Sequence, residues 1–427
     1  MIGTTLLTGP AYLERQRDRQ WAVLAVRVAA PVAVPVVAVP VVVAPVVVGA
    51  EHRRQMPDFA TARQPVRSAE RWPQLDPAGE VDLEDPAQIE TAVQGILDRR
   101  YAGGYDTALL HLAMTDVARA YCGEYPGLLR CDALYHDLRH SLDTALTMAR
   151  MLDGCAHVHP PGAAAGIDAA HALLGILLAL FHDIGLLRRD SEEHLWGPVL
   201  YPVHEERGVA FVQAYLSNTS LSPFAGEARL IMATKLVFKI PDSWTAQERL
   251  LASLVATADL VSQTSDRCYL EKCRDFVYSE FSAFGLAGKP DSLYPSSRML
   301  LEKTPAFVED FLQKRLDEEL LGVRQYLRIH MRGADPWGKA MRRNVAYLKE
   351  LIETDDLARL RRRPAPYTGG ARQPVSRQPS AAPEPPAQNS APQVTAFALD
   401  RAVSEPNATE VGPSGFHRST AVARPRG

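Results

Sequence analysis

The sequence predicts an all-α protein: a helical bundle between residues 85 and 355, with disordered N- and C-terminal extensions. Three observations predict this fold class. Apolar residues recur at helical spacing through most of the central region. Strand-like alternation of apolar and polar residues is almost absent there. The composition, 46% hydrophobic and 23% charged over 427 residues, is sufficient to bury a large core.

Residues 1–84 have the composition of a low-complexity extension rich in Val, Pro and Ala. The uncharged stretch 29–50 is long enough to cross a bilayer of about 30 Å as a helix. Its prolines disfavour a stable spanning helix, because each removes a backbone donor and clashes with the preceding turn; they are Pro31, Pro35, Pro40 and Pro45. We therefore expect a disordered extension, and leave open a membrane anchor at 29–50 or a processed targeting sequence.

Helical segments follow in order along the central region. Amphipathic stretches lie at 89–100, 106–122, 143–154 and 248–263. Asp106 supplies a start signal for the second stretch, and Asp242 with Ser243 precedes the last one. Residues 172–181 are apolar or small on all sides, so this helix should run through the middle of the bundle. Residues 356–427 are rich in Pro, Ala and Ser, and this composition predicts a disordered tail.

Polar residues with metal-binding chemistry interrupt the apolar helices. His182 and Asp183 follow the most apolar helix, and a buried carboxylate must be paired or bound to a metal to offset its desolvation. Asp259 is embedded in apolar sequence of a second helix. His136 and His140 are four residues apart, so they project from one helical face. Together these residues predict a site for a divalent metal ion, which could be Mn, Fe, Zn, Ni or Mg.

The same residues resemble a known family. His140, then His182 and Asp183, then Asp259 reproduce the H…HD…D order of the HD superfamily of metal-dependent phosphohydrolases, within a motif core at 135–265. The stretch YHDLRHSLDTALTMARML is similar to the opening YHNxxHAxDV of class I cyclic-nucleotide phosphodiesterases, with Asp137 where that family has Asn.

The resemblance implies an HD-domain helical bundle and assigns a role to each matching residue. It implies that the metal ligands are His140, His182, Asp183 and Asp259. It also implies that Asp183 links the ion to the attacking water. His136 would protonate the leaving oxygen, a role that imidazole fills well near pH 7.

The sequence departs from the patterns of both similar families. Class I phosphodiesterases continue HDxDHxG, whereas this chain reads HDIGLLRRD. HDIG followed by His-x-x-x-Gly is more similar to the HD-GYP cyclic-dinucleotide hydrolases, and would make His204 a further metal ligand. The Lys of that family is Leu186 here, its GYP triplet is missing, and residues 232–241 replace its paired histidines. These departures argue against a complete two- or three-metal site and against a eukaryote-like purine pocket.

Four more residues are candidates for roles around the site. Asp143 is placed to hold the ring N–H of His140. Gln263 and Arg267 continue a polar stripe along one helical face, where Gln263 would read a base or sugar edge and Arg267 would neutralise phosphate. Arg188 would grip phosphate with two hydrogen bonds. For Gln263, Arg267 and Arg188, a solvated surface position is the alternative interpretation.

These features predict a metal-dependent hydrolase that cleaves a phosphoester, such as a cyclic nucleotide or a nucleotide phosphodiester, with a metal-activated water. One alternative is a di-iron oxygenase of the same superfamily, which needs two more histidines between Asp183 and Asp259, where only His194 and His204 lie. The other alternative is a catalytically silent HD-like domain that binds partners through its helices.

Charge and cysteine content limit the partners and the compartment. A net charge of -3 and a pI of about 6.5 give no electrostatic footprint for nucleic acid. We expect a phosphorylated small molecule, a nucleotide, as the partner, and membrane association only through residues 29–50. The five cysteines are odd in number and form no Cys-x-x-Cys pair, a pattern that predicts a cytoplasmic protein. The sequence indicates no oligomeric state.

Overall fold

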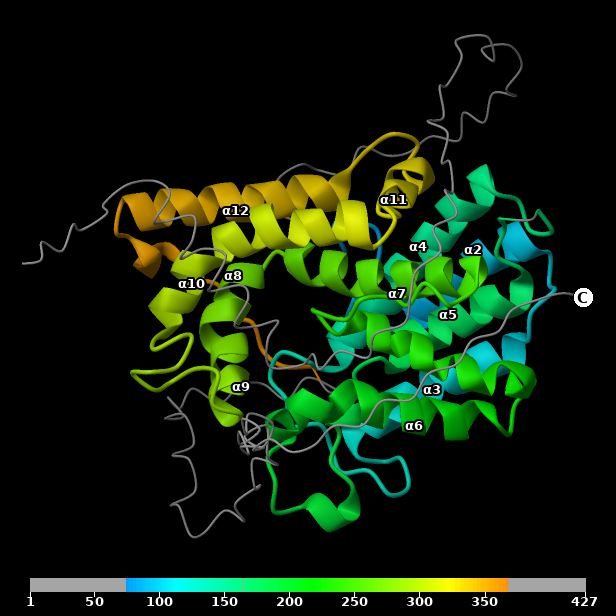
Figure 1. The fold of residues 1–427 in the computed structure, drawn as a ribbon, viewed down its shortest axis with the longest axis horizontal. Helices are drawn as coiled ribbons and strands as arrows, with labels where there is room; N and C mark the ends of the chain where they lie inside the picture. Colours follow the sequence, from blue (N-terminus) through cyan, green and yellow to red (C-terminus); the bar gives the residue numbers. More distant parts are fainter. Residues whose placement is uncertain (1–73, 164, 368–427) are drawn as a thin grey trace, which may run out of the picture. The chain divides into compact units, whose positions relative to one another are not determined.

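The computed structural model describes residues 74–163 and 165–367 (Figure 1). Within these residues the protein is all-α: helices account for the regular structure, and only isolated bridges, without a sheet, join extended residues. The predicted fold class is therefore confirmed for the part of the chain that is described.

The α-helices, in chain order, are α2 (Pro86–Tyr101), α3 (Thr107–Cys122), α4 (Leu138–Val158), α5 (Ala169–Phe181), α6 (His204–Leu216), α7 (Ala246–Ser265), α8 (Tyr269–Lys272), α9 (Tyr278–Ala283), α10 (Ser297–Ala306), α11 (Gln325–His330) and α12 (Pro336–Glu353). Short 3₁₀ segments are η1 (Ile184–Leu186), η2 (Asp190–Glu192), η3 (Gly197–Val203), η4 (Ser222–Thr234) and η8 (Leu357–Arg359). Three wider π-helical segments are η5 (Cys273–Val277), η6 (Phe307–Leu312) and η7 (Arg315–Glu319).

Side-chain caps fix where the helices begin. Asp106 accepts a hydrogen bond from the backbone N–H of Leu109 and starts α3, as the sequence predicts. The predicted start of α7 at Asp242 and Ser243 is too early. Thr245 is the cap, because its hydroxyl accepts from the N–H of Glu248 while the Glu248 carboxylate accepts from the N–H of Thr245.

The most apolar helix lies at the centre, as the sequence predicts. All residues of α5 from Ala172 to Phe181 are buried, and the helix packs against α3, α4 and α7. Figure 1 shows α12 above α7, which it contacts. The stretch Ala169–Leu186 is long and apolar enough to cross a membrane, but 89% of it is buried inside the protein, so it is a core helix. The stretch 29–50 lies outside the described residues.

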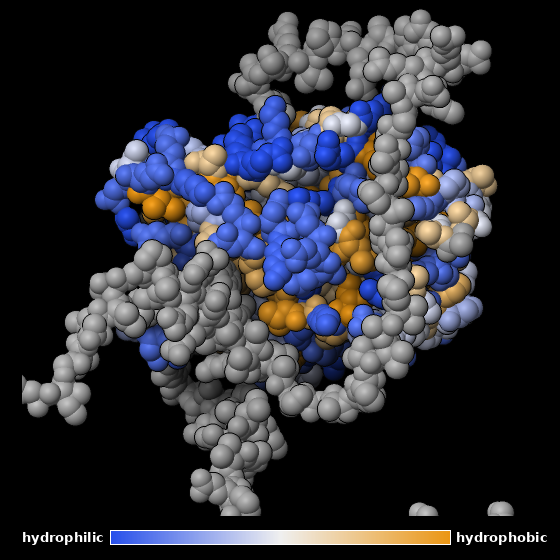
Figure 2. Space-filling model, turned by 45° about the horizontal axis from the view of Figure 1, so that its top comes forward, coloured by the Kyte–Doolittle hydropathy of each residue, from blue (hydrophilic) through white to orange (hydrophobic). Residues whose placement is uncertain are grey.

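The surface of the described bundle matches this division between core and exterior. On the face shown in Figure 2, hydrophilic side chains predominate and apolar ones form separate patches. Helix α12 illustrates the pattern, because it buries Trp337, Met341, Val345 and Leu348 on one side and carries charged residues on the other.

The folded region extends beyond the predicted bounds of 85 and 355. Before α2, Val81 and Leu83 are buried, and Asp76 accepts a hydrogen bond from Arg150 of α4. After α12, Leu360 is buried. The predicted extension 1–84 and tail 356–427 thus each contain a packed stretch, 74–84 and 356–367. Their apolar anchors are too few to form a periodic pattern that would reveal them. Residues 1–73, 164 and 368–427 are outside the described part of the chain, where the prediction of disorder stays a prediction.

Candidate metal centre

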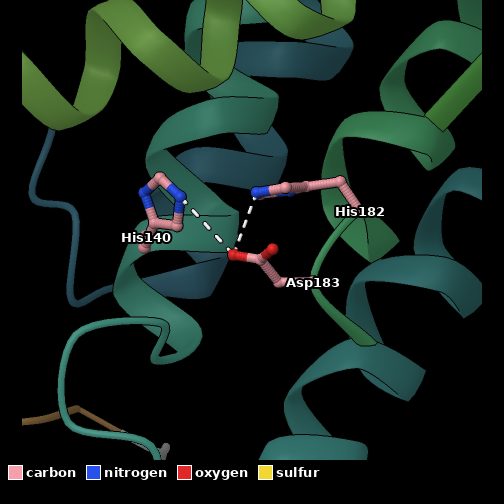
Figure 3. A group of neighbouring side chains, drawn as sticks. All are labelled: His140, His182 and Asp183. Atoms are coloured by element: carbon pink, nitrogen blue, oxygen red, sulfur yellow. Dashed lines mark ion pairs between the residues drawn. The ribbon is translucent and has the colours of Figure 1, made fainter. Parts of the chain in front are cut away.

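Three side chains from two helices converge in the interior (Figure 3). His140 lies in the first turn of α4, His182 is the residue at which α5 ends, and Asp183 follows it. Asp183 Oδ2 lies 3.0 Å from His182 Nε2 and 3.6 Å from His140 Nε2. One ligand atom of each of these three buried residues lies within 4.8 Å of the other two, so the group could hold a metal ion.

Asp259 of α7 brings a second carboxylate to the same place. Its Oδ1 lies 3.1 Å from His140 Nε2 and 3.7 Å from His182 Nε2. The structure therefore places side by side the four residues that the H…HD…D order selects, although α7 begins more than 60 residues after Asp183 along the chain. Imidazole nitrogens and carboxylate oxygens in this combination suit a divalent transition-metal ion.

The converging atoms have no hydrogen-bond partners. His140 Nε2, His182 Nε2 and Asp183 Oδ2 are all buried, and none is hydrogen-bonded in the structure. A buried polar atom without a partner costs about 1–3 kcal/mol, and native proteins contain few of them. Three such atoms directed at one point are what a cation requires, so the residues fit a metal ion.

The second ring nitrogen of two histidines fixes the tautomer that a metal ligand needs. His182 Nδ1 lies 2.9 Å from the carbonyl oxygen of Ala179, and His204 Nδ1 lies 2.5 Å from that of Tyr201. A carbonyl oxygen only accepts hydrogen bonds, so each Nδ1 carries the proton. When such a ring is neutral, its lone pair lies on Nε2, the atom nearest the Asp183 carboxylate, where it can bind a metal.

The electrostatics of the cluster favour a positive charge at its centre. Burial by itself would raise the pKa of Asp183, but the imidazoles of His182 and His136 outweigh it and hold that pKa well below its usual range. Burial would likewise lower the pKa of His182, but the carboxylates of Asp183 and Asp259 raise it to about 9. The carboxylates thus draw either a proton or a metal ion into the site, and the two compete.

A close backbone approach brings His204 to the same aspartate. A side chain at Gly185 of η1 would collide with the carbonyl oxygen of His204, so only glycine lets η1 pack this closely on the start of α6. His204 Nε2 then lies 3.4 Å from Asp183 Oδ1, the oxygen that does not face His182. Asp183 therefore lies between His140 and His182 on one side and His204 on the other. His204 could extend the metal site on its side of the carboxylate.

His136 is held by a residue that sequence reasoning missed. The buried carboxylate of Glu280, on α9, accepts from the backbone N–H groups of Leu134 and Tyr135 at 2.7 and 2.6 Å, and from His136 Nδ1 at 2.6 Å. Burial opposes charge on His136, but Glu280 and Asp183 raise its pKa to about 9. Glu280 is 144 residues away from His136 along the chain, on a helix without any motif, so no signal in the sequence could have paired them.

A cavity of about 260 Å³ opens beside the cluster. Its wall includes His136, Asp183, His204 and Asp259, so one side of the candidate metal centre faces a space that a ligand could enter. Most of the remaining wall is apolar, and the aromatic side chains in it include Tyr201, Phe281, Tyr294, Phe307 and Phe311. The last two lie on the π-helical segment η6, a conformation found often at functional sites.

Of the three residues predicted to bind substrate, Gln263 lines this cavity and the two arginines do not. Arg267 lies at a separate hollow together with Arg139 and Asp266. Helix α7 ends at Ser265, so the helical stripe that was extrapolated to Arg267 has already stopped. The structure therefore places Arg267 away from the cavity, contrary to the sequence-based expectation.

Arg188, predicted to grip phosphate, is also placed away from the cavity. Its guanidinium pairs with Asp132 at 3.1 Å and donates to the carbonyl oxygens of Glu193 and Leu195, each at 3.0 Å. These contacts close the loop that follows η1, so the side chain is already occupied by the protein itself.

Asp143 does not orient His140, contrary to the sequence-based expectation. Its carboxylate lies at the same hollow as Arg139 and Asp266 and accepts from the Thr147 hydroxyl at 3.4 Å. Arg139 carries the opposite charge four residues earlier on the helix, the spacing at which side chains meet, and it lines the same hollow as Asp143.

The buried position of Asp143 makes stability depend on pH. Burial raises its pKa to about 7, while Arg139 opposes the shift. The ordinary pKa is about 4, so the folded protein holds this proton more tightly than the unfolded chain does. The stabilisation is complete below about pH 4 and is lost as the pH rises through about 7.

We therefore expect Asp143→Asn, which cannot ionise, to raise the melting temperature more at about pH 8 than at about pH 5. Thermal unfolding at the two pH values measures the effect. Asp242→Asn, at a side chain that is 86% exposed, serves as the control and should change neither melting temperature. An equal shift at both pH values for Asp143→Asn would contradict the assignment of a raised pKa.

Comparison with known proteins adds no family assignment. The sequence matches no protein-family model, and a search of curated proteins finds no match to it. The candidate metal centre therefore rests on the residues and their geometry.

Proposed function

We propose that this chain is a metal-dependent hydrolase of a phosphoester, of the HD type that its motif order resembles. One observation carries the proposal: the buried Nε2 atoms of His140 and His182 and Oδ2 of Asp183, none of them hydrogen-bonded, converge beside a cavity that has His136 on its wall. A catalytically silent binding domain has no need to keep three polar atoms buried at such cost.

The chain's own residues divide the work in this proposal. A divalent ion would be held by His140, His182, Asp183 and Asp259, and when bound it lowers the pKa of a water and offsets phosphate charge. His136 keeps a proton because Glu280 accepts from its Nδ1. The other ring nitrogen of His136 can then donate a proton to the leaving oxygen.

The cavity supports a phosphorylated small molecule, and specifically a nucleotide, as the substrate. Its aromatic wall suits a flat base, and the Gln263 amide can both donate to and accept from a base edge. Lys235 and Lys303 supply positive charge on the same wall. Lys235 is already paired with Glu206 at 2.7 Å, so little charge remains to hold a polyphosphate. This balance favours a phosphodiester that carries a single negative charge.

We also propose a reducing, cytoplasmic compartment for the protein. No disulfide joins any of the cysteines in the described residues. The predictions that the protein does not bind nucleic acid and that membrane association is limited to residues 29–50 stand on the sequence alone.

The proposed activity is tested on the full chain purified without chelator. We expect the protein to contain a divalent ion and to hydrolyse bis-p-nitrophenyl phosphate or a cyclic nucleotide. Turnover should stop on chelation and return when Mn²⁺ is added, because the ion activates the water. Metal content by mass spectrometry and release of nitrophenol are the measurements. Iron with oxygen consumption and no phosphoester turnover would instead indicate the oxygenase, and protein without any metal would indicate a binding domain.

A further inference from the structure

The end of the described chain forms a C-terminal strap, residues 360–367, that returns to the metal centre. The strap begins after η8, where the carbonyl oxygen of Leu360 accepts from Arg274 at 2.7 Å. Arg362 then bonds to the carboxylate of Glu271 in α8 through its backbone N–H and its guanidinium, at 3.4 and 3.3 Å. The strap ends at the start of α4, the helix whose first turn carries His140.

Asp137 joins the strap to this helix with both of its carboxylate oxygens. Oδ1 accepts from the backbone N–H of His140 at 3.1 Å and caps α4. Oδ2 accepts from the backbone N–H of Tyr367 at 2.7 Å. The Leu138 N–H in turn donates to the carbonyl oxygen of Tyr367 at 2.9 Å. Asp137 is 1% exposed, so water cannot readily replace either partner.

This arrangement explains why the chain has Asp137 where the similar phosphodiesterase motif has Asn. An asparagine has one acceptor oxygen and a donor NH₂ group. If its oxygen capped α4, its NH₂ group would face the N–H of Tyr367, and two donors would meet in a buried place. Only a carboxylate accepts from His140 and from Tyr367 at the same time.

We infer that Asp137 and the C-terminal strap act together as a clamp that positions the first turn of α4, and with it the metal ligand His140. The part of this inference that concerns metal rests on the proposed function. The clamp itself rests on the hydrogen bonds of Asp137 and Tyr367 alone.

Two substitutions in the full chain break the same hydrogen bond from opposite sides. Asp137→Asn removes the acceptor, and Tyr367→Pro removes the donor N–H while keeping the carbonyl oxygen that Leu138 uses. Tyr367→Phe keeps the backbone N–H and is the matched control. Asp85→Asn changes the carboxylate that caps α2, away from the metal centre, and controls for the loss of a helix cap.

Two readouts are measured for each variant. Calorimetric titration with Mn²⁺ reports the affinity of the metal centre. Hydrogen exchange of the backbone amides at 138–141, in metal-free protein, reports the order of the first turn of α4. Thermal unfolding shows whether a change in either is merely a change in global stability.

We expect Asp137→Asn and Tyr367→Pro to weaken Mn²⁺ binding by about 10-fold, as loss of a residue that orients a ligand does. Both should also speed exchange at 138–141, while Tyr367→Phe and Asp85→Asn leave affinity and exchange at wild-type values. If Tyr367→Pro behaves like Tyr367→Phe in both readouts, the clamp is overturned. If the wild type binds no Mn²⁺ but the first two variants still speed exchange, the clamp is supported and the proposed metal centre fails.

Discussion

Replacing Asp183 with alanine is expected to abolish both metal binding and phosphoester turnover. Asp183 is the residue on which the cluster centres, since its two oxygens lie within 3.0–3.6 Å of His182, His140 and His204. Without the Asp183 carboxylate, the only negative charge left among the ligands would be that of Asp259. One negative charge cannot neutralise a divalent ion, and neutral imidazole ligands add none. Loss of a residue that only orients a metal ligand lowers metal affinity by up to about 100-fold. We expect the loss of Asp183, itself a ligand, to lower metal affinity by more than that.

Metal content after dialysis and turnover of a phosphodiester measure this effect. Asp183→Asn is the stricter variant, because it keeps the shape of the side chain and removes its charge. Asp242→Ala, at an exposed carboxylate, is the control and should bind metal normally. An Asp183→Ala protein that retains a full complement of metal would show that the ion lies elsewhere.

Replacing His136 with alanine is expected to separate chemistry from metal binding. His136 lines the cavity and is held by Glu280, but it does not belong to the group of residues that could hold the metal ion. Metal should therefore remain bound while turnover falls by about 10²- to 10⁴-fold, the contribution typical of general acid catalysis. His111→Ala, at a histidine whose side chain is 70% exposed, is the matched control.

The leaving group distinguishes a proton donor from a structural residue. The loss caused by His136→Ala should shrink for a p-nitrophenyl phosphodiester, whose leaving group needs no proton, and should be full for an alkyl leaving group. If His136→Ala lost its metal, His136 would be a ligand instead. Full activity of the variant on a poor leaving group would remove His136 from the mechanism.

The pH dependence of turnover provides an independent check on the same residue. Glu280 raises the pKa of His136, so the wild type should lose activity as the pH rises and the acid loses its proton. Glu280→Gln removes the carboxylate that contributes most to this raised pKa. The alkaline limb of the pH–rate profile should therefore move to lower pH in that variant. If His136 had only a structural role, the limb would stay at the same pH.

Local sequence patterns were sufficient to predict the helical core and the converging residues. Helix α5 is apolar on all sides and is buried on all sides. His140 and Asp259 lie on helices whose sequences are amphipathic or apolar. A polar side chain among their apolar residues is buried, so it needs a partner inside the protein. The order of these residues along the chain then selected the four that the fold places together.

Contacts that depend on how helices end and pack could not be predicted. Arg267 was placed by continuing a helical face past Ser265, where α7 stops. The pair formed by Glu280 and His136 joins α9 to the segment before α4, and the two share no motif. Tyr367 contributes only its backbone N–H and carbonyl oxygen to these contacts, so its own residue type does not reveal them. Each of these cases depends on tertiary packing rather than on local periodicity.

The most direct test of the candidate metal centre is anomalous X-ray scattering from crystals of the protein loaded with Mn²⁺. We predict a peak between His140 Nε2, His182 Nε2, Asp183 Oδ2 and Asp259 Oδ1, with metal–ligand distances of roughly 2.0 to 2.6 Å. A crystal that shows no anomalous peak among these four atoms, or shows Mn²⁺ only at other residues, would contradict the account.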